Sequence, residues 1–308
     1  MRRILVIRGG AIGDFILTLP ALKLLRNGFP DARIEILGYK HIIALAENRF
    51  YAQATRSIEY GPLASFFSNQ SELPAELADY FAGFDLVISY LFDPDHIFEA
   101  NVRRCGVDNF IFANPKVDGN EHAARHLARP LEQLNLKLGR HAAELYPSEA
   151  DRRAARDLVD AAPSSIIALH PGSGSAMKNW PIENWIALGD AVFSRQCPPA
   201  RVVVVGGEAD EIQLRRLESV WKDQEVFFAK NLPLPTLAAL LEGSLFVGHD
   251  SGISHVAAAT GARCLLLFGP SDPAIWAPAN EQVQILRAPG GNLSALQFEA
   301  VREAFPTS

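Results

Sequence analysis

The sequence is poor in cysteine and in long apolar runs, and each shortage excludes a class of protein. The three cysteines, Cys105, Cys197 and Cys264, lie far apart, without the close spacing of a zinc site or a redox pair. No apolar run reaches the roughly 18 residues of a membrane-spanning helix, so any membrane contact is expected to be peripheral. The first seven residues run directly into a strand pattern, without the apolar region and cleavage site of a secretory signal. We therefore expect a cytoplasmic protein.

An excess of positive charge is also missing. Lys and Arg together number 29 against 35 Asp and Glu, which gives a net charge of −6, and neither half of the chain is basic. A nucleic-acid-binding protein normally carries clustered Lys and Arg on one face. In the first half, the pairs Arg2-Arg3 and Arg103-Arg104 are the densest clusters. We therefore expect no nucleic-acid partner.

The chain is long enough for two domains. It has 308 residues, of which 48% are hydrophobic and 21% are charged, values close to those of globular proteins. A polar passage over residues 149–163 separates two series of strand-like segments. We place one domain at residues 1–150 and the other at 151–308.

Both halves alternate short β-branched or apolar runs with longer segments of helical period, which predicts an α/β fold with parallel sheets. The second-half runs are apolar on both faces, which is typical of strands buried on both sides. Such sheets bind ligands beyond the carboxyl ends of their strands. The predicted strands are 4–7, 34–37, 86–90 and 110–112, then 166–169, 201–205, 226–228, 245–247 and 264–268.

Glycines and capping residues mark several helices. Gly28 closes a predicted helix over residues 22–27, and Gly139 closes another over 122–138. Ser294 is a candidate cap for a last helix that reaches Phe305, with packing back on the first domain as one option.

The loop after the first strand carries Gly9, Gly10, Gly13 and Asp14. It lacks both the G-x-G-x-x-G fingerprint of a dinucleotide site and the G-K-[ST] of a phosphate loop. Its glycines allow the backbone to approach a ligand, and Asp14 stands at a helix start. Taken alone, the loop favours Asp14 as a helix cap, with a site role as the alternative.

Three loops of the second half also follow predicted strands. Ser173, Gly174, Ser175 and Lys178 form a candidate phosphate cradle, although for Lys178 taken alone the loop favours a solvated surface lysine. Trp180 and Trp185 after it are expected to be packing anchors.

The next such loop contains Glu208, Asp210 and Glu211. An acidic side chain here can accept hydrogen bonds from both ribose hydroxyls, and the alternative is an ordinary acidic helix start.

The last loop contains Asp250, Ser251 and Gly252 and leads into a helix of small residues. The start of that helix offers free N–H groups and a positive dipole end to a phosphate. His255 lies four residues after Ser251, on the same helix face. A structural role is usual for a single histidine, but beside this loop we favour a site role.

Taken together, these motifs resemble one family, glycosyltransferase family 9, the heptosyltransferases. The match covers residues 4–20 and 170–278, while residues 40–120 match in strand order alone. It rests on Gly13-Asp14, on Lys178-x-Trp-Pro-x-x-x-Trp, and on Asp250-Ser-Gly-x-x-His255 followed by Leu267-Phe-Gly-Pro-Ser-Asp-Pro273.

The resemblance implies a GT-B architecture, in which two Rossmann-like domains face across a cleft. The first domain is then on the acceptor side and the second binds the donor nucleotide. Family members transfer heptose from ADP-heptose with inversion, to the lipopolysaccharide core at the cytoplasmic face of the inner membrane. By the same resemblance Asp14 is the general base, Lys178, Ser251 and Gly252 contact the phosphates, and Asp250 and His255 contact the donor.

The second half has no D-x-D carboxylate pair, so we expect no required metal and no cofactor besides the donor. The chain departs from the family after the strand 86–90. Members that act on the inner core carry a Lys near a glycine there, whereas this chain has Asp93 and Asp95. Two carboxylates would repel an acidic sugar.

Three other functions stay open from the sequence. One is a GT-B enzyme with a different nucleotide-sugar donor, either a transferase or an epimerase. Another is a nucleotide-sugar-binding relative without turnover, against which Asp14 argues. The third, an NAD-dependent enzyme, is weakened by the missing fingerprint.

Overall fold

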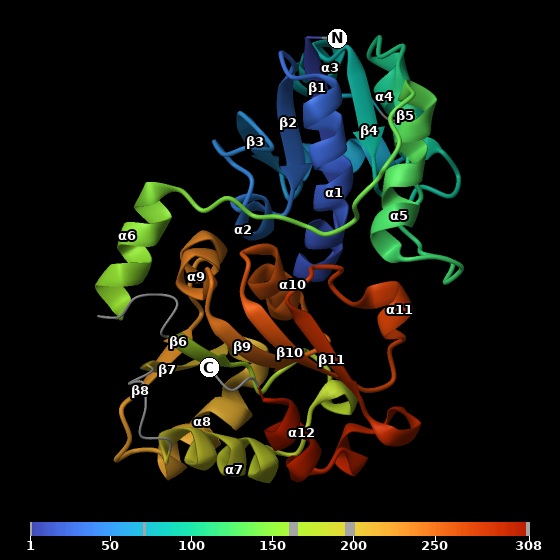
Figure 1. The fold of residues 1–308 in the computed structure, drawn as a ribbon. Helices are drawn as coiled ribbons and strands as arrows, with labels where there is room; N and C mark the ends of the chain where they lie inside the picture. Colours follow the sequence, from blue (N-terminus) through green and yellow to red (C-terminus); the bar gives the residue numbers. More distant parts are fainter. Residues whose placement is uncertain (1, 70–71, 160–165, 195–200, 306–308) are drawn as a thin grey trace. The chain divides into compact units, whose positions relative to one another are not determined.

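The structure is a computed structural model that describes residues 2–69, 72–159, 166–194 and 201–305. The chain forms two compact units, Met1–His141 and Ala142–Ser308 (Figure 1). The boundary placed after residue 150 from the sequence falls within helix α6 (Glu149–Leu158), which belongs to the second unit. Cys197 and residues 160–163 of the expected boundary passage lie outside the described residues.

The first unit is an open parallel sheet with the strand order β3-β2-β1-β4-β5. Helices α1 and α5 pack together on one face, and α3, α4 and η1 cover the other (Figure 1). The strands are β1 (Arg3–Arg8), β2 (Arg33–Gly38), β3 (Ala54–Ser57), β4 (Leu86–Ser89) and β5 (Phe110–Phe112). The helices are α1 (Ile12–Gly28), α2 (Lys40–Ile43), η1 (Gly61–Phe67), α3 (Ala75–Ala82), α4 (Ile97–Arg104), α5 (Ala123–Ala128) and η2 (Arg129–Leu134).

The second unit is a parallel sheet with the order β11-β10-β9-β6-β7-β8. Helices α7, α8 and α12 cover one face and α9 and α10 the other, with α6 packed on α9 (Figure 1). The strands are β6 (Ile166–Leu169), β7 (Arg201–Gly206), β8 (Val226–Lys230), β9 (Leu245–His249), β10 (Arg263–Phe268) and β11 (Val283–Arg287). The helices are η4 (Ala176–Lys178), α7 (Ile182–Phe193), η5 (Glu208–Asp210), α8 (Glu211–Val220), α9 (Leu234–Leu241), α10 (Gly252–Ala259), α11 (Pro273–Trp276), η6 (Pro289–Gly291), η7 (Leu293–Ala295) and α12 (Phe298–Ala304).

Each sheet has a point where the chain reverses its direction of winding. In the first unit this point lies between β1 and β4, and in the second between β6 and β9. The loops that leave such neighbouring strands diverge to opposite faces and leave room for a ligand between them. The α/β class predicted from the sequence is therefore confirmed, and the topology selects the loops after these four strands.

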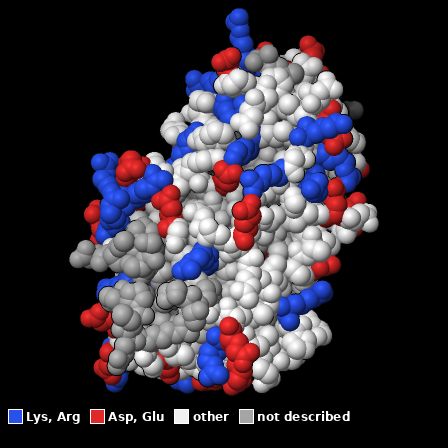
Figure 2. Space-filling view, viewed as in Figure 1, with Lys and Arg blue, Asp and Glu red and all other residues white. Residues whose placement is uncertain are grey.

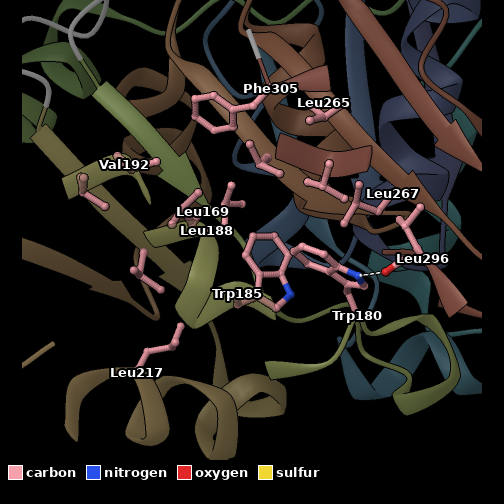
Figure 3. Packing of buried hydrophobic residues seen from close by; sticks show 14 of the residues in the cluster. Leu169, Trp180, Trp185, Leu188, Val192, Leu217, Leu265, Leu267, Leu296 and Phe305 are labelled. Carbon is pink, nitrogen blue, oxygen red and sulfur yellow. Dashed lines mark hydrogen bonds between the residues drawn. The ribbon is translucent and has the colours of Figure 1, made fainter. Parts of the chain in front are cut away.

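The second unit is packed around a buried cluster that includes both predicted anchors, Trp180 and Trp185 (Figure 3). Their rings meet edge to face with centroids 5.6 Å apart. The indole N–H of Trp180 donates a hydrogen bond of 2.8 Å to the carbonyl of Leu296, so its polar atom is satisfied inside the core. These contacts hold the segment that follows Lys178 against the sheet.

Five elements differ from the sequence prediction. The helix predicted over residues 22–27 is the end of the longer α1, which begins at Ile12 and includes Gly28. Strands β3 and β11 were not predicted, because both are half-buried edge strands with polar residues in their runs. The helix predicted over 122–138 is divided into α5 and η2. The last helix begins at Phe298 rather than near Ser294, and its Val301 lies in the core of the second unit.

Basic and acidic side chains are interspersed over the face shown in Figure 2. No helix within the described ranges is long and apolar enough to cross a membrane.

Candidate functional site

The loops after β6 and β9 come together at the winding reversal of the second unit. Lys178 ends the short helix η4 after β6, and Asp250 follows β9 directly. The Lys178 Nζ atom lies 2.6 Å from Oδ2 of Asp250, although 72 residues separate them in the chain. The Lys178 side chain is 32% exposed and that of Asp250 only 10%. Lys178 is thus half of a partly buried ion pair and not a freely solvated lysine.

Ser251 caps the N-terminus of helix α10. Its hydroxyl accepts a hydrogen bond of 3.3 Å from the Ser254 N–H, and Gly252 is the first helical residue. The positive end of the helix dipole therefore lies directly after Asp250. Within α10, His255 is buried, and its backbone N–H donates to the Ser251 carbonyl at 3.3 Å.

A buried histidine links Ser251 to the acidic loop. Nδ1 of His170 lies 3.3 Å from the Ser251 hydroxyl, and its Nε2 lies 3.6 Å from Oδ2 of Asp210. The Asp210 carboxylate also accepts the Gly207 N–H at 2.9 Å. Burial raises the pKa of Asp210, but the His170 ring and the Gly207 N–H outweigh it and hold that pKa below its usual value. Asp210 therefore stays ionised and faces inward.

The inward position of Asp210 requires a glycine opposite it. A Cβ atom on Gly172 would lie 1.6 Å from Asp210 Oδ1, which leaves no room for any other residue without movement. The two remaining acidic residues of this loop, Glu208 and Glu211, are exposed, and Glu211 pairs with Arg215 at 2.5 Å. Glu208 and Glu211 are thus the carboxylates that a ligand reaches from solvent.

The predicted phosphate cradle is an exposed turn. Gly174 has a φ of +73°, a backbone conformation that favours glycine. The Ser173 hydroxyl lies 2.6 Å from Oδ1 of Asn179, and the Ser175 N–H donates back to that hydroxyl at 3.4 Å. The turn precedes Lys178 by a few residues, so the cradle and the ion pair belong to one loop.

His249, the last residue of β9, was missed from the sequence. Its Nε2 accepts the Trp180 N–H at 2.9 Å, and its Nδ1 lies 3.1 Å from the Gly172 carbonyl. The carbonyl can only accept, so Nδ1 carries the proton. Complete burial lowers the pKa of His249 to about 3, so the ring is neutral. His249 therefore connects the loop after β6 to the end of β9. The signal in the sequence that could have identified it is a polar residue at the end of an apolar strand.

In the first unit, Asp14 lies in the first turn of α1, next to Gly13. Its Oδ2 accepts the Ala11 N–H at 2.9 Å, which is the capping role favoured by the loop alone. Its Oδ1 lies 3.5 Å from the guanidinium of Arg8, and the side chain is 40% exposed. One carboxylate oxygen therefore stabilises the helix start, and the carboxylate remains accessible to solvent.

Arg8 was not selected from the sequence. It is 4% exposed, and its Nε donates a hydrogen bond of 2.9 Å to the Thr18 hydroxyl. Burial lowers the pKa of the guanidinium, and the Asp14 carboxylate partly opposes this effect. An arginine remains charged under such conditions, so Asp14 has a fixed positive neighbour.

Asp14 lines a pocket of about 560 Å³ in the first unit. Segments that follow all five strands contribute to it, as expected at the carboxyl edge of an open sheet. Arg8 is the last residue of β1 and Asp14 follows that strand, while Tyr39 comes after β2, Glu59 after β3, Phe92 after β4 and Pro115 after β5.

The loop after β4 corrects one interpretation from the sequence. Asp93 is 6% exposed and accepts the backbone N–H groups of Phe98 and Glu99 at 3.2 and 3.0 Å. It caps helix α4, so it is not a carboxylate offered to an acceptor. Asp95 is exposed, but it does not line the pocket.

Residues 111–302 match the model of glycosyltransferase family 9 (heptosyltransferase). The chain belongs to glycosyltransferase family 9. It is 25% identical over 299 residues to lipopolysaccharide heptosyltransferase 3 of Escherichia coli, an alignment that covers 88% of this chain and 85% of that protein. This family 9 chain is thus a heptosyltransferase-like glycosyltransferase.

Two solved structures share its fold. The family 9 glycosyltransferase of Veillonella parvula DSM 2008 superposes with a TM-score of 0.80 at 20% identity, over 98% of this chain and 95% of that one. The ADP-heptose lps heptosyltransferase II of E. coli gives 0.77 at 17% identity, over 98% and 97%. The two parallel sheets of this family 9 chain are therefore those of the GT-B fold.

Within the described part of the chain, no group of three or more His, Cys, Asp or Glu side chains is arranged to hold a metal ion.

Proposed function

We propose that this glycosyltransferase transfers heptose from ADP-heptose, with inversion, to a lipopolysaccharide core or a related glycan. The observation that carries the proposal is the Lys178–Asp250 pair beside the start of α10, at the winding reversal of the second sheet. The names of the relative and of the E. coli structural neighbour supply the heptose and the ADP.

The second unit binds the donor in this proposal. The diphosphate lies against the start of α10, where Ser251 and Gly252 begin the helix, and against Lys178. Negative charge grows on the diphosphate as the sugar leaves, and a lysine and a helix dipole stabilise it without reorganising. Asp250 holds the Lys178 ammonium at 2.6 Å before the donor arrives. This contact keeps the cation at the carboxyl ends of β6 and β9, where the diphosphate binds in this proposal.

Other residues of the second unit complete the donor site. Glu208 and Glu211 are the exposed candidates for the ribose hydroxyls, with Asp210 positioning the loop from behind. The turn formed by Ser173, Gly174 and Ser175 covers the phosphates, and His255 contributes from α10. We assign Asp250 a second contact to the donor sugar.

Asp14 is the general base of the proposal. The acceptor hydroxyl attacks the anomeric carbon from the face opposite the nucleotide, its proton passes to the Asp14 carboxylate, and the bond from that carbon to the diphosphate oxygen breaks. A positioned base contributes about 10²–10⁴-fold to such a step. The guanidinium of Arg8, 3.5 Å from Oδ1 of Asp14, places a fixed positive charge beside this carboxylate.

We propose that the reaction needs no metal, because Lys178 and the start of α10 supply the positive charge that a metal ion would otherwise provide. Turnover in excess chelator measures this directly. Undiminished turnover supports the proposal, whereas turnover that is lost and then restored by a divalent cation contradicts it.

Thermal-shift titration with ADP, UDP, GDP, NAD and ADP-heptose tests the donor assignment. A ligand at 100 times its Kd stabilises the folded protein by about 2.7 kcal/mol, which is readily measured. We expect stabilisation by ADP and ADP-heptose. Stabilisation by UDP or GDP alone indicates another GT-B donor, and stabilisation by NAD alone indicates a dehydrogenase.

The acceptor is a glycolipid in this proposal, so transfer takes place in the cytoplasm at the inner membrane face. Co-sedimentation with vesicles of inner-membrane lipid, with and without the acceptor glycolipid, tests this peripheral contact. Release of the protein by salt is the expected behaviour of a surface-bound enzyme.

A further inference from the structure

The pocket around Asp14 is lined by several aromatic side chains. Besides the buried Tyr90, three exposed aromatic residues line it from three different segments: Tyr39 after β2, Phe67 at the end of η1 and Phe92 after β4. Their exposed fractions are 37%, 46% and 69%. Single exposed apolar residues are common on protein surfaces, but three around one pocket mark a binding surface.

The surrounding structure holds the ring of Phe67 and the loop that carries Phe92. Phe67 packs against the buried ring of Phe98 with centroids 4.9 Å apart. Phe92 stands between buried Leu91 and Asp93, and the two hydrogen bonds that Asp93 accepts at the start of α4 hold this loop. The exposure of Phe92 is therefore imposed by a capped, well-packed loop.

The charge of the pocket is slightly negative. The described residues that line it include one cation, Arg8, and two carboxylates, Asp14 and Glu59. Arg8 is buried and lies 3.5 Å from Asp14, so these two charges largely compensate each other. The exposed carboxylate of Glu59 is left without a cation among the lining residues.

We infer that the pocket binds an uncharged sugar of the acceptor, with its C–H face stacked on Phe92 and its neighbours and its nucleophilic hydroxyl at Asp14. The inference rests on the proposed transferase function and names its acceptor class. Aromatic faces carry partial negative charge and suit the weakly positive C–H groups of a pyranose ring. A carboxylate or phosphate on that sugar meets Glu59 and the ring faces instead, and the described residues that line the pocket offer it no accessible cation.

A panel of three soluble acceptors tests the inference with the full chain and ADP-heptose. The first is an uncharged heptose-terminated oligosaccharide, the second is the same compound phosphorylated on its terminal heptose, and the third ends in a carboxylate sugar. We expect the uncharged acceptor to have a kcat/KM at least about tenfold above the others, the scale of one unfavourable charge contact. Failure to use the uncharged acceptor overturns the inference, whatever happens with the charged ones.

Variants of the pocket locate the effect. Phe92→Ala removes a largely exposed ring and is expected to raise the acceptor KM about tenfold, with the donor KM unchanged. Phe50→Ala is the matched control, because Phe50 is 36% exposed in the same unit and does not line the pocket. Glu59→Lys is expected to improve use of the phosphorylated acceptor. An unchanged acceptor KM in Phe92→Ala and an unchanged preference in Glu59→Lys overturn the inference.

Failure of the proposed function has a different signature. Stabilisation by ADP and slow hydrolysis of ADP-heptose without acceptor depend on the donor site alone. If both are present and a charged acceptor is preferred, the transferase function stands and the acceptor class is wrong. If neither is present, the donor assignment itself fails.

Discussion

Replacement of Lys178 by alanine separates a catalytic ammonium from a structural one. The Nζ atom of Lys178 lies 2.6 Å from Asp250, whose side chain is only 10% exposed, so the variant leaves a nearly buried carboxylate unpaired. Breaking a fully buried pair costs about 3–5 kcal/mol and an exposed pair about 0–1. With Lys178 one-third exposed, we expect a loss of about 1–2 kcal/mol in the free energy of unfolding.

The effect on catalysis is larger. Loss of a charge contact to the departing diphosphate costs roughly 3–4 kcal/mol in the transition state, which is several hundredfold in rate. The transfer rate is measured with saturating donor and acceptor, and the free energy of unfolding is measured by urea titration. Lys230→Ala is the matched control, because Lys230 also forms an ion pair in this unit, at 2.5 Å from Glu218, with both side chains well exposed. We expect that control to change stability by less than about 1 kcal/mol and leave the rate unchanged.

The double variant Lys178→Ala with Asp250→Asn decides between the two roles. It leaves no unpaired charge, so most of the lost stability should return. The transfer rate should stay low, because no ammonium faces the diphosphate. Wild-type turnover in Lys178→Ala, or recovery of turnover together with stability in the double variant, would refute the phosphate role of Lys178.

Three further predictions follow from the geometry. Asp14→Asn keeps an oxygen that can cap helix α1 but removes the general base. Stabilisation by ADP should therefore persist, while kcat should fall about 10²–10⁴-fold. An unchanged kcat would mean that Asp14 acts as a helix cap alone. Gly172→Ala places a Cβ 1.6 Å from Asp210 and should lower the free energy of unfolding, measured by urea titration, by about 1–3 kcal/mol. Gly139→Ala is the control and should leave that free energy unchanged, because a Cβ at Gly139 has open space around it. His249 has a pKa of about 3 in the folded protein and 6.5 in the unfolded chain, so below pH 6.5 the unfolded chain binds a proton that the folded protein does not. The free energy of unfolding should therefore fall on acidification below pH 6.5, by up to ~1.4 kcal/mol per pH unit. His249→Gln should reduce this pH dependence, and an unchanged slope of unfolding free energy against pH in that variant contradicts the prediction.

Much of the fold could be predicted because its signals are local. The strands β1, β2, β6, β7 and β10 are dense in β-branched or apolar residues, and nearly every position in them is buried. Edge strands β3 and β11 were missed, because a strand that is paired on one side only needs no continuous apolar run.

The candidate site was predicted as a set of loops but not as a set of contacts. The sequence placed Lys178 and Asp250 in loops that follow strands, and an ion pair across 72 residues depends on which strands are neighbours in the sheet. The role of His249 was hidden for the same reason, since its partners Trp180 and Gly172 lie on a distant loop. Asp93, taken for an acceptor-facing carboxylate, caps α4 because its oxygens lie at the start of that helix.

The amino-acid sequence by itself determined the α/β class, the strand-exit loops and the family, because periodicity, glycine positions and short motifs are properties of neighbouring residues. The tertiary structure decided the direction in which each side chain points: Asp210 inward to His170 and Asp14 to both Ala11 and Arg8. It also gathered Tyr39, Phe67 and Phe92 around one pocket. These relations depend on strand order and burial, which arise only when segments far apart in the chain pack together.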